Sequence, residues 1–158
     1  MKFIITLLVF LGLSVNLNVV YAASGASLDS TGSSLYKSGK KLVIKAKKLE
    51  EKDKIEKADK LYLKALDKLE KAYDKDKKNA DILNYLGFAL RKTGDFKKAE
   101  KFYLEGLALD SEHLGINEYL GELYVQTGRI DLAKERLQVL SGCKCEEYEE
   151  LKELIEKN

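Results

Sequence analysis

Two cysteines are the side chains in this sequence best suited to redox or metal chemistry. Cys143 and Cys145 are separated by one residue and follow a Ser141-Gly142 turn. Residues two apart on one helix point to nearly opposite sides, so a disulfide between them requires at least one cysteine to lie in the turn. We expect structural thiols or a structural disulfide; a disulfide would close a very small loop and add little stability. The alternative is a thiol redox or metal-carrier protein, in which the pair is redox-active or holds a soft metal such as copper(I).

The single histidine, His113, lies in an expected loop. Asp110 and Glu112 precede it, and the next helix is expected to start directly after it. A Ser-His-Asp triad needs a serine held in a strained turn, whereas Ser111 is only an adjacent loop residue. We therefore expect His113 to order the start of that helix. The sequence also lacks a glycine-rich phosphate loop, a His-Glu-x-x-His helix and a calcium loop. The interpretation is a protein that is not an enzyme, with no catalytic residue, cofactor, metal or small-molecule substrate.

The N-terminal segment, residues 1–22, has the pattern of a secretory signal peptide. Lys2 precedes an apolar run from Phe3 to Leu17, and Val20-Tyr21-Ala22 places small or apolar residues before the expected cleavage site. The apolar run is shorter than the ~20 residues that span a membrane, although an uncleaved anchor is the alternative. We expect this segment to be removed, so that the protein meets a membrane only before cleavage and is exported to the periplasm or cell envelope.

Composition and charge describe the remaining chain as helical. The full sequence contains no proline, 34% of its residues are charged, and no segment alternates like a strand. Residues 37–78 carry 16 lysines against 9 acids, whereas residues 110–158 carry 12 acids against 6 basic residues. The lysines alternate with acids and lack interleaved aromatic residues, which favours a solvated helix surface over nucleic-acid binding.

An internal repeat of 34 residues organises the second half of the sequence. Residues 82–87 match residues 116–121 under this shift, and the same shift aligns Gly94 with Gly128 and Ala99 with Ala133. Each unit predicts two antiparallel helices. In the middle unit, we expect Asn79 to cap a first helix that ends near Lys92, Gly94 to form the turn, and Asp95 to cap the second helix.

These repeated residues resemble the tetratricopeptide repeat over residues 80–141. The residues that carry the resemblance are Leu86, Gly87, Gly94, Ala99, Tyr103, Leu120, Gly121, Tyr124, Gly128 and Ala133. The resemblance implies an all-α fold, a right-handed superhelix of antiparallel helix pairs with a C-terminal capping helix. More narrowly, the run from His113 to Tyr124 and the segment 145–148 resemble short exported bacterial tetratricopeptide proteins of unestablished role.

The expected domain organisation follows from the repeat phase. A flexible Ser/Gly-rich tether covers residues 23–33, and a domain of helix pairs covers residues 34–158. Its parts are a degenerate pair at 34–78 (helices Leu35–Leu49 and Glu56–Tyr73), repeats at 80–113 and 114–144, and a capping helix at 145–157. The first pair is called degenerate because the repeat phase places Lys52 and Asp53 where the repeats have Leu-Gly.

The resemblance implies a concave wall, formed by the first helices of the repeats, that binds a protein or peptide partner. We expect six exposed residues on that wall, which share the side of their helices opposite the apolar stripe: Asn84, Phe88, Arg91, Glu118, Glu122 and Val125. The alternative is an ordinary amphipathic helix whose outer face contacts water. The asparagine position of the carboxylate clamp known in some relatives holds Tyr85 and Tyr119, so that binding mode is not expected.

Overall fold

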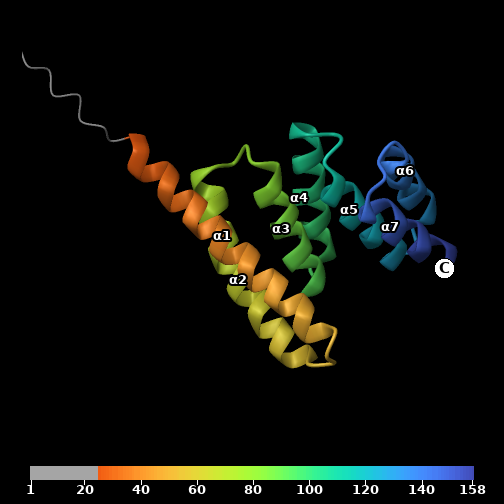
Figure 1. Cartoon of the computed structure of the whole chain (residues 1–158), viewed down its shortest axis with the longest axis horizontal. Coiled ribbons are helices and arrows are strands. Elements are labelled where there is room, and N and C mark those ends of the chain that lie inside the picture. The colour runs from red at the N-terminus through yellow and green to blue at the C-terminus, as the bar shows by residue number, and fades with distance from the viewer. Residues whose placement is uncertain (1–24) are drawn as a thin grey trace, which may run out of the picture.

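The computed structural model describes residues 25–158 and forms seven α-helices there, with no strand in that range (Figure 1). The helices are α1 (Gly25–Glu50), α2 (Ile55–Lys75), α3 (Ala80–Lys92), α4 (Phe96–Leu109), α5 (Leu114–Gln126), α6 (Ile130–Leu140) and α7 (Glu146–Glu156). The expected signal peptide, residues 1–22, lies outside the described residues.

Among the described residues, no helix combines the length and the hydropathy that crossing a membrane requires.

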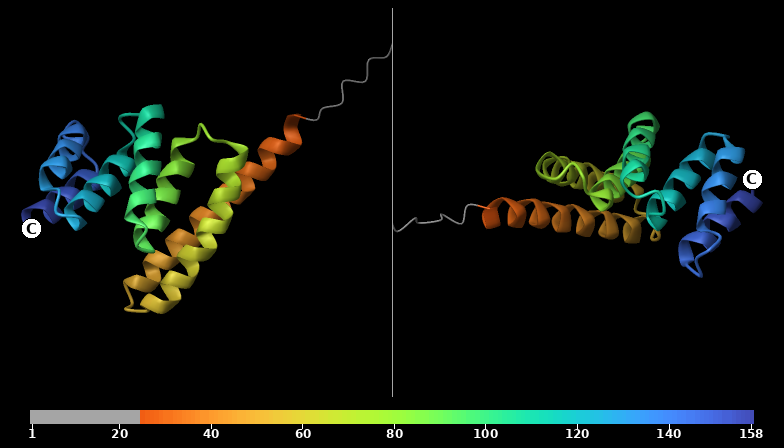
Figure 2. Two further views of the ribbon diagram at one scale, coloured as in Figure 1. Left: turned by 180° about the vertical axis from the view of Figure 1, so that it is seen from behind. Right: turned by 90° about the horizontal axis from the view of Figure 1, so that it is seen from above.

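The helices form successive pairs that stack along the long axis of the molecule. α1 packs chiefly on α2, α3 on α4, and α5 on α6, while α7 covers α5 and α6. Neighbouring pairs meet through α2 with α3 and α4 with α5, and α3 also contacts both α1 and α5. Figures 1 and 2 show the pairs following one another from α1 to the C-terminal α7. The expected all-α solenoid with a capping helix is confirmed.

The ends of the middle pair follow the sequence signals. Asn79 Oδ1 accepts a hydrogen bond from the backbone N–H of Ile82 at 3.2 Å, and Asp95 Oδ1 accepts one from Lys98 at the same distance. Each bond satisfies an amide group that the first turn of a helix leaves unpaired. Gly94 has φ +88°, a left-handed conformation that glycine adopts without strain. The predicted caps and turn are therefore confirmed.

His113 has the structural role expected of it. Its Nδ1 accepts a hydrogen bond from the backbone N–H of Ile116 at 3.2 Å, which caps α5. Asn117 lies fully buried beneath the same loop and donates from Nδ2 to the carbonyl oxygens of Ser111 and His113, both at 3.1 Å. This buried amide fixes the connection between α4 and α5.

The first helix pair departs most from the expectation. α1 is helical from Gly25, so the prediction of a flexible tether over residues 23–33 is wrong over nearly its whole length. A Cβ atom built on Gly39 would lie 2.6 Å from Leu69, and one built on Gly87 would lie 2.5 Å from the ring of Tyr103. Gly39 and Gly87 therefore occupy equivalent helix crossings. Leu69 precedes Tyr103 by one repeat period, whereas Gly39 precedes Gly87 by considerably more than one period.

The first hairpin is thus longer than a regular repeat. Residues 45–61, which we call the extended tip, stand where the next pair has only the turn at residues 93–95. The excess corresponds to about two extra helical turns on each of α1 and α2. The insertion shifts the crossing glycine, Gly39, out of the repeat phase, and Ser38 precedes it in place of leucine. These two differences explain why the repeat could not be traced into the first helix.

Small residues let the helices approach closely elsewhere in the stack. Ala99 and Ala133 are fully buried, as the repeat pattern predicts. Gly121 is covered by Leu151, because a Cβ atom at Gly121 would lie 2.5 Å from a methyl group of that leucine. Leu151 belongs to α7, so the capping helix closes the last glycine crossing of the solenoid.

Candidate partner-binding surface

The six residues expected on an exposed wall are mostly buried. Five of them belong to the interior: Asn84, Phe88, Arg91, Glu118 and Val125. Only Glu122 is partly exposed. The prediction of an open wall at these positions is wrong. Lys47 of the extended tip lies over Phe88, and Glu150 of α7 lies beside Glu118. Arg91 pairs with Glu122 of α5.

Phe88 lies within a cluster of aromatic rings and is 3% exposed. Its ring centroid is 4.7 Å from that of Tyr119 on α5 and 6.0 Å from that of Tyr62 on α2. Lys47 of the extended tip places its Nζ 5.6 Å from the centroid of the Phe88 ring. Phe88 is therefore a core residue that joins the first hairpin to the middle of the solenoid.

Arg91 and Glu122 neutralise one another and are not both free for a partner. Arg91 Nη2 lies 2.5 Å from Glu122 Oε2, and the guanidinium group stacks 5.3 Å from the Phe88 ring centroid. The Arg91 side chain is almost fully buried. Loss of one member would leave a buried charge without its counterion, so this pair stabilises the α3–α5 contact.

Polar contacts hold the extended tip on the inner wall. By inner wall we mean the side of the solenoid formed by the first helices of the pairs, α1, α3 and α5. Glu50 Oε2 accepts a hydrogen bond from the Tyr62 hydroxyl at 2.8 Å and forms an ion pair with Lys92 Nζ at 2.8 Å. Lys47 Nζ lies 3.5 Å from the Tyr119 hydroxyl, a contact between residues 72 positions apart. These contacts close the end of the inner wall nearest the tip.

The inner wall remains accessible nearer the start of α3. There the half-buried rings of Tyr36 and Tyr85 meet edge to face, with centroids 6.0 Å apart. Lys40 Nζ lies 5.2 Å from the Tyr85 centroid and 6.0 Å from the Tyr36 centroid. Lys47 lies two helical turns after Lys40, on the same side of α1, above Tyr119. We call Tyr36, Lys40, Lys47, Tyr85 and Tyr119 the tyrosine–lysine strip.

Electrostatics keeps the strip positively charged. The phenol groups of Tyr85 and Tyr36 raise the pKa of Lys40 above its ordinary value. Lys40 is therefore an ammonium group at neutral pH, and its half-buried aromatic neighbours limit its access to water. The sequence reasoning used Tyr85 and Tyr119 only to exclude a carboxylate clamp and missed their exposure. The seven-residue spacing of Lys40 and Lys47 places both lysines on one side of a helix, and this pattern could have indicated the strip from the sequence.

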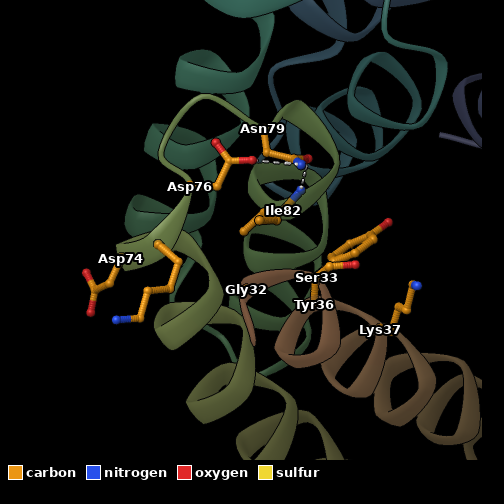
Figure 3. Close-up of a pocket in the computed structure, with 9 residues that line it drawn as sticks. Gly32, Ser33, Tyr36, Lys37, Asp74, Asp76, Asn79 and Ile82 are labelled. Carbon is orange, nitrogen blue, oxygen red and sulfur yellow. Dashed lines mark hydrogen bonds between the residues drawn. The ribbon is translucent and has the colours of Figure 1, made fainter. Parts of the chain in front are cut away.

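A pocket of about 620 Å³ continues the strip toward the N-terminal half of α1 (Figure 3). Tyr36 belongs to both the pocket and the strip, and Lys37 and Lys75 contribute positive charge to the pocket wall. On the opposite wall, Asp76 Oδ2 accepts a hydrogen bond from Asn79 Nδ2 at 3.2 Å. The pocket and the strip together form a continuous surface along α1 and the start of α3.

A second, smaller pocket is acidic and lies where α1, α5 and α7 meet. It measures about 130 Å³ and is lined by Lys47, Glu118, Tyr119, Glu146, Glu147 and Glu150. One carboxylate oxygen from each of Glu118, Glu122 and Glu150 lies within 4.8 Å of the others. Burial, a hydrogen bond with Glu150 and the charge of Glu122 raise the pKa of Glu118 to about 10. Such oxygens are also ligands for hard cations, so the expectation of no metal stays a prediction.

Cys143 and Cys145 are joined by a disulfide in the connection between α6 and α7. Their Cα atoms are 5.2 Å apart, and both residues are half-buried. Cys145 immediately precedes the first residue of α7, so the bond closes a short segment outside regular helix. This placement satisfies the geometric requirement that at least one cysteine lie in the turn.

Stacked helix pairs with glycine and alanine at their crossings define an α-solenoid. A family model described as tetratricopeptide repeat matches residues 49–112. The matched residues make up less than half of the chain, and together with the structural likenesses that follow they show that the chain has the tetratricopeptide-repeat fold. Among curated proteins, none matches the chain.

Solved structures of tetratricopeptide repeat proteins share the fold. A thermophilic repeat protein of Thermus thermophilus superposes with a TM-score of 0.56 and 23% identity, over 63% of this chain and 53% of that one. The type III secretion translocator chaperone SycD of Yersinia enterocolitica gives 0.56 and 17%, over 82% and 91%. The second repeat domain of human RPAP3, solved with an HSP70 peptide, gives 0.51 and 19%, over 78% and 97%. The chain thus spans about half the length of the Thermus protein.

Proposed function

We propose that this protein is a protein–protein interaction module that binds a peptide segment of its partner along the tyrosine–lysine strip. The observation that carries the proposal is the row of half-exposed tyrosine rings and lysines on the first helices of the solenoid, α1 and α3. Half-exposed tyrosines offer apolar contact area at a low cost in side-chain entropy. Two lysines on one side of α1 add charge-assisted hydrogen bonds to a partner.

The extended tip determines the size of the bound segment. Its Lys47 lies over Phe88, and Arg91 is buried in its pair with Glu122, so we place the bound segment on the part of the inner wall between Tyr36 and Tyr119. A short peptide segment fits this restricted surface better than a folded domain. The RPAP3 domain of the same fold was solved with a peptide, which supports this mode of recognition by analogy.

We further propose that the protein is exported and acts as a non-enzymatic adaptor in the periplasm or cell envelope. This part of the proposal rests on the signal-peptide pattern of residues 1–22. Mass spectrometry of the protein from its native cells tests it. A mature chain that begins at Ala23 would support export, and a chain that retains residues 1–22 in a cytoplasmic fraction would contradict it.

Selection from a random peptide display library tests the binding function. The bait is the chain from Ala23 onward, and selected peptides are titrated against it and against Tyr85→Ser. Because removal of an aromatic anchor costs ~2 kcal/mol, we expect Kd to rise at least about tenfold. The matched control is Leu104→Ser, which changes an exposed side chain on α4, outside the strip.

The affinities are compared only if both variants unfold at the same thermal midpoint as the parent chain. Unchanged affinity in Tyr85→Ser, or equal loss in Leu104→Ser, would contradict the strip as the binding surface. Failure to select any peptide would contradict peptide recognition itself.

A further inference from the structure

Glu118 is a buried carboxyl group without a cationic partner in the described part of the chain. Its side chain lines the acidic pocket and is 3% exposed, yet no lysine or arginine of residues 31–158 lies within ion-pair distance of it. The two nearest cations are engaged elsewhere, Arg91 with Glu122 and Lys47 with the Tyr119 ring and hydroxyl. A buried carboxylate without a counterion is costly, so this group requires either a proton or a cation from outside.

The pocket has two solvent-accessible side chains on α7. Glu150 is exposed and Glu147 is half-buried, and both line the pocket, so a cation from solvent can reach it past these residues, which we call the rim. Five glutamates surround the site, namely Glu118, Glu122, Glu146, Glu147 and Glu150, against two cations, Lys47 and Arg91. A volume of about 130 Å³ admits a group of a few heavy atoms, such as an ammonium or guanidinium tip.

The acidic pocket and the tyrosine–lysine strip share two residues. Lys47 and Tyr119 line the pocket and also form the end of the strip nearest α5. A peptide that lies on the strip therefore reaches the pocket without leaving the inner wall.

We propose that the acidic pocket receives a lysine or arginine side chain of the bound peptide, which pairs with Glu118 and with the carboxyl groups at the rim. This inference rests on the proposed function and adds to it the chemistry of one partner residue. On binding, the Glu118 carboxyl group releases its proton to solvent and the incoming cation takes its place, so charge is conserved within the pocket. No bond other than this O–H bond breaks.

A basic side chain suits the pocket better than a divalent metal ion. Calcium takes six to eight oxygen ligands, whereas Glu122 already holds Arg91 at 2.5 Å. Arg91 is buried and cannot turn away without losing Glu122, its counterion. A planar guanidinium or a compact ammonium needs fewer oxygens and accepts this geometry.

The test begins with a probe that does not depend on a selected peptide. N-acetyl-arginine amide is titrated into the chain labelled with ¹³C at glutamate carboxyl groups, and N-acetyl-glutamine amide is the neutral control. We expect the Glu118 carboxyl signal to move to its deprotonated position with the arginine probe only. The same titration on the Glu147→Gln, Glu150→Gln double variant should require at least about tenfold more probe, because the charge-assisted contacts at the rim are lost.

A matched variant controls for the loss of two charges on α7. Glu149→Gln with Glu156→Gln removes the same charge from exposed positions of the same helix that do not line the pocket. Its response to the probe should equal that of the parent chain. Equal weakening in both double variants would indicate general electrostatic attraction and would overturn the proposal.

Selected peptides provide the second measurement. Peptides that bind the strip should carry lysine or arginine at one position, and its replacement by glutamine should weaken binding to the parent chain more than binding to Glu147→Gln, Glu150→Gln. Peptides that depend on Tyr85 but show no such position would overturn this inference and leave the proposed function intact. Absence of any selected peptide, with a normal response of Glu118 to the arginine probe, would contradict the proposed function and leave the basic-side-chain pocket supported.

A Glu118 signal that does not respond to the arginine probe but moves with Ca²⁺ would overturn the proposal in favour of a metal site.

Discussion

At the scale of single residues, Phe88 shows how burial changes the role of an apolar side chain. It lies against the rings of Tyr62 and Tyr119 and beneath the ammonium group of Lys47. Truncation of a buried phenylalanine typically lowers the free energy of unfolding by ~3–5 kcal/mol, through lost transfer energy and the cavity left behind. We expect Phe88→Ala to lose this amount in urea denaturation. Phe96→Ala is the control, because Phe96 is 38% exposed, and it should change stability by less than about 1 kcal/mol.

Equal and small effects of these two alanine variants would contradict the packing of the extended tip on the inner wall. Such a result would indicate that the Phe88 side chain is exposed, as the repeat pattern predicted.

Glu118 predicts a pH dependence of stability with a definite sign. The ordinary pKa of the group is 4.5, and in the folded protein its pKa is raised to about 10, chiefly by burial. Between these values the folded state binds one more proton than the unfolded state, so the free energy of unfolding falls as pH rises. The stabilisation is complete below the unfolded pKa and is lost as pH passes through the folded pKa.

Urea midpoints measured at several pH values between roughly 5 and 9 check this prediction. The parent chain should lose stability toward high pH, and Glu118→Gln, which cannot titrate, should show a flatter dependence. A parent curve that rises with pH over this range would contradict the protonated state of Glu118. Other carboxyl groups contribute to both curves, so the difference between the two curves is the quantity that matters.

The sequence predicted single residues well where the interaction is local. Asn79, Asp95 and His113 cap helices through bonds to residues three positions away, and such patterns are visible in one dimension. The environment of Glu118 depends on Glu150 and Lys47, which are distant in the sequence and belong to other helices. No periodicity encodes that meeting, because it depends on how α1 and α7 fold over α5.

At the scale of helices, the 34-residue period determined which helices could be predicted from the sequence. It placed α3 to α6 and the capping helix within a few residues of their observed ends. It failed at α1, because the insertion in the extended tip separates Gly39 from its regular phase. Lys47 of the same insertion covers Phe88, whereas Glu118 lies beside Glu150 of α7. The insertion therefore accounts for the error in the fold and for part of the error in the candidate site.

Shortening the first hairpin tests this explanation. Residues 45–61 are replaced by Thr-Gly-Asp, the turn that joins α3 to α4. We expect a folded chain of unchanged helical character in which Tyr119 becomes accessible, because Lys47 and Glu50 no longer cover the wall. The rate of Tyr119 nitration should rise severalfold, while fully buried Tyr103 remains the internal control. An unchanged Tyr119 rate in a folded variant would show that the extended tip does not cover the wall.

The disulfide belongs to the connection before α7 and predicts a local effect. Cys143 and Cys145 enclose one residue, so the bond restricts the unfolded chain very little. The Cys143→Ser, Cys145→Ser double variant should lose less than about 1 kcal/mol of stability and keep its affinity for selected peptides. Titration calorimetry with those peptides measures the affinity of the variant and of the parent chain. Loss of cellular activity at normal abundance and unchanged peptide affinity would instead favour the thiol redox or metal-carrier alternative.

At the scale of the whole molecule, charge is divided along the solenoid. The lysine-rich segment 37–78 forms the first hairpin, and the acidic segment 110–158 forms the end capped by α7. Figure 2 shows these two parts at opposite ends of the stack. A bound segment that crosses the inner wall from α1 to α5 therefore meets lysines first and glutamates last. If the proposed binding surface is correct, this polarity favours a bound segment with acidic residues near Lys40 and a basic residue near Glu118.

The most direct test of the account is photo-crosslinking in cells that produce the protein. The crosslinking amino acid p-benzoylphenylalanine replaces Tyr85 on the strip or, in a separate chain, Leu104 on α4, which is exposed outside the strip. We expect a discrete adduct from position 85 after irradiation and none of that mass from position 104. An adduct only from position 104, or identical adducts from both positions, would contradict partner binding on the tyrosine–lysine strip.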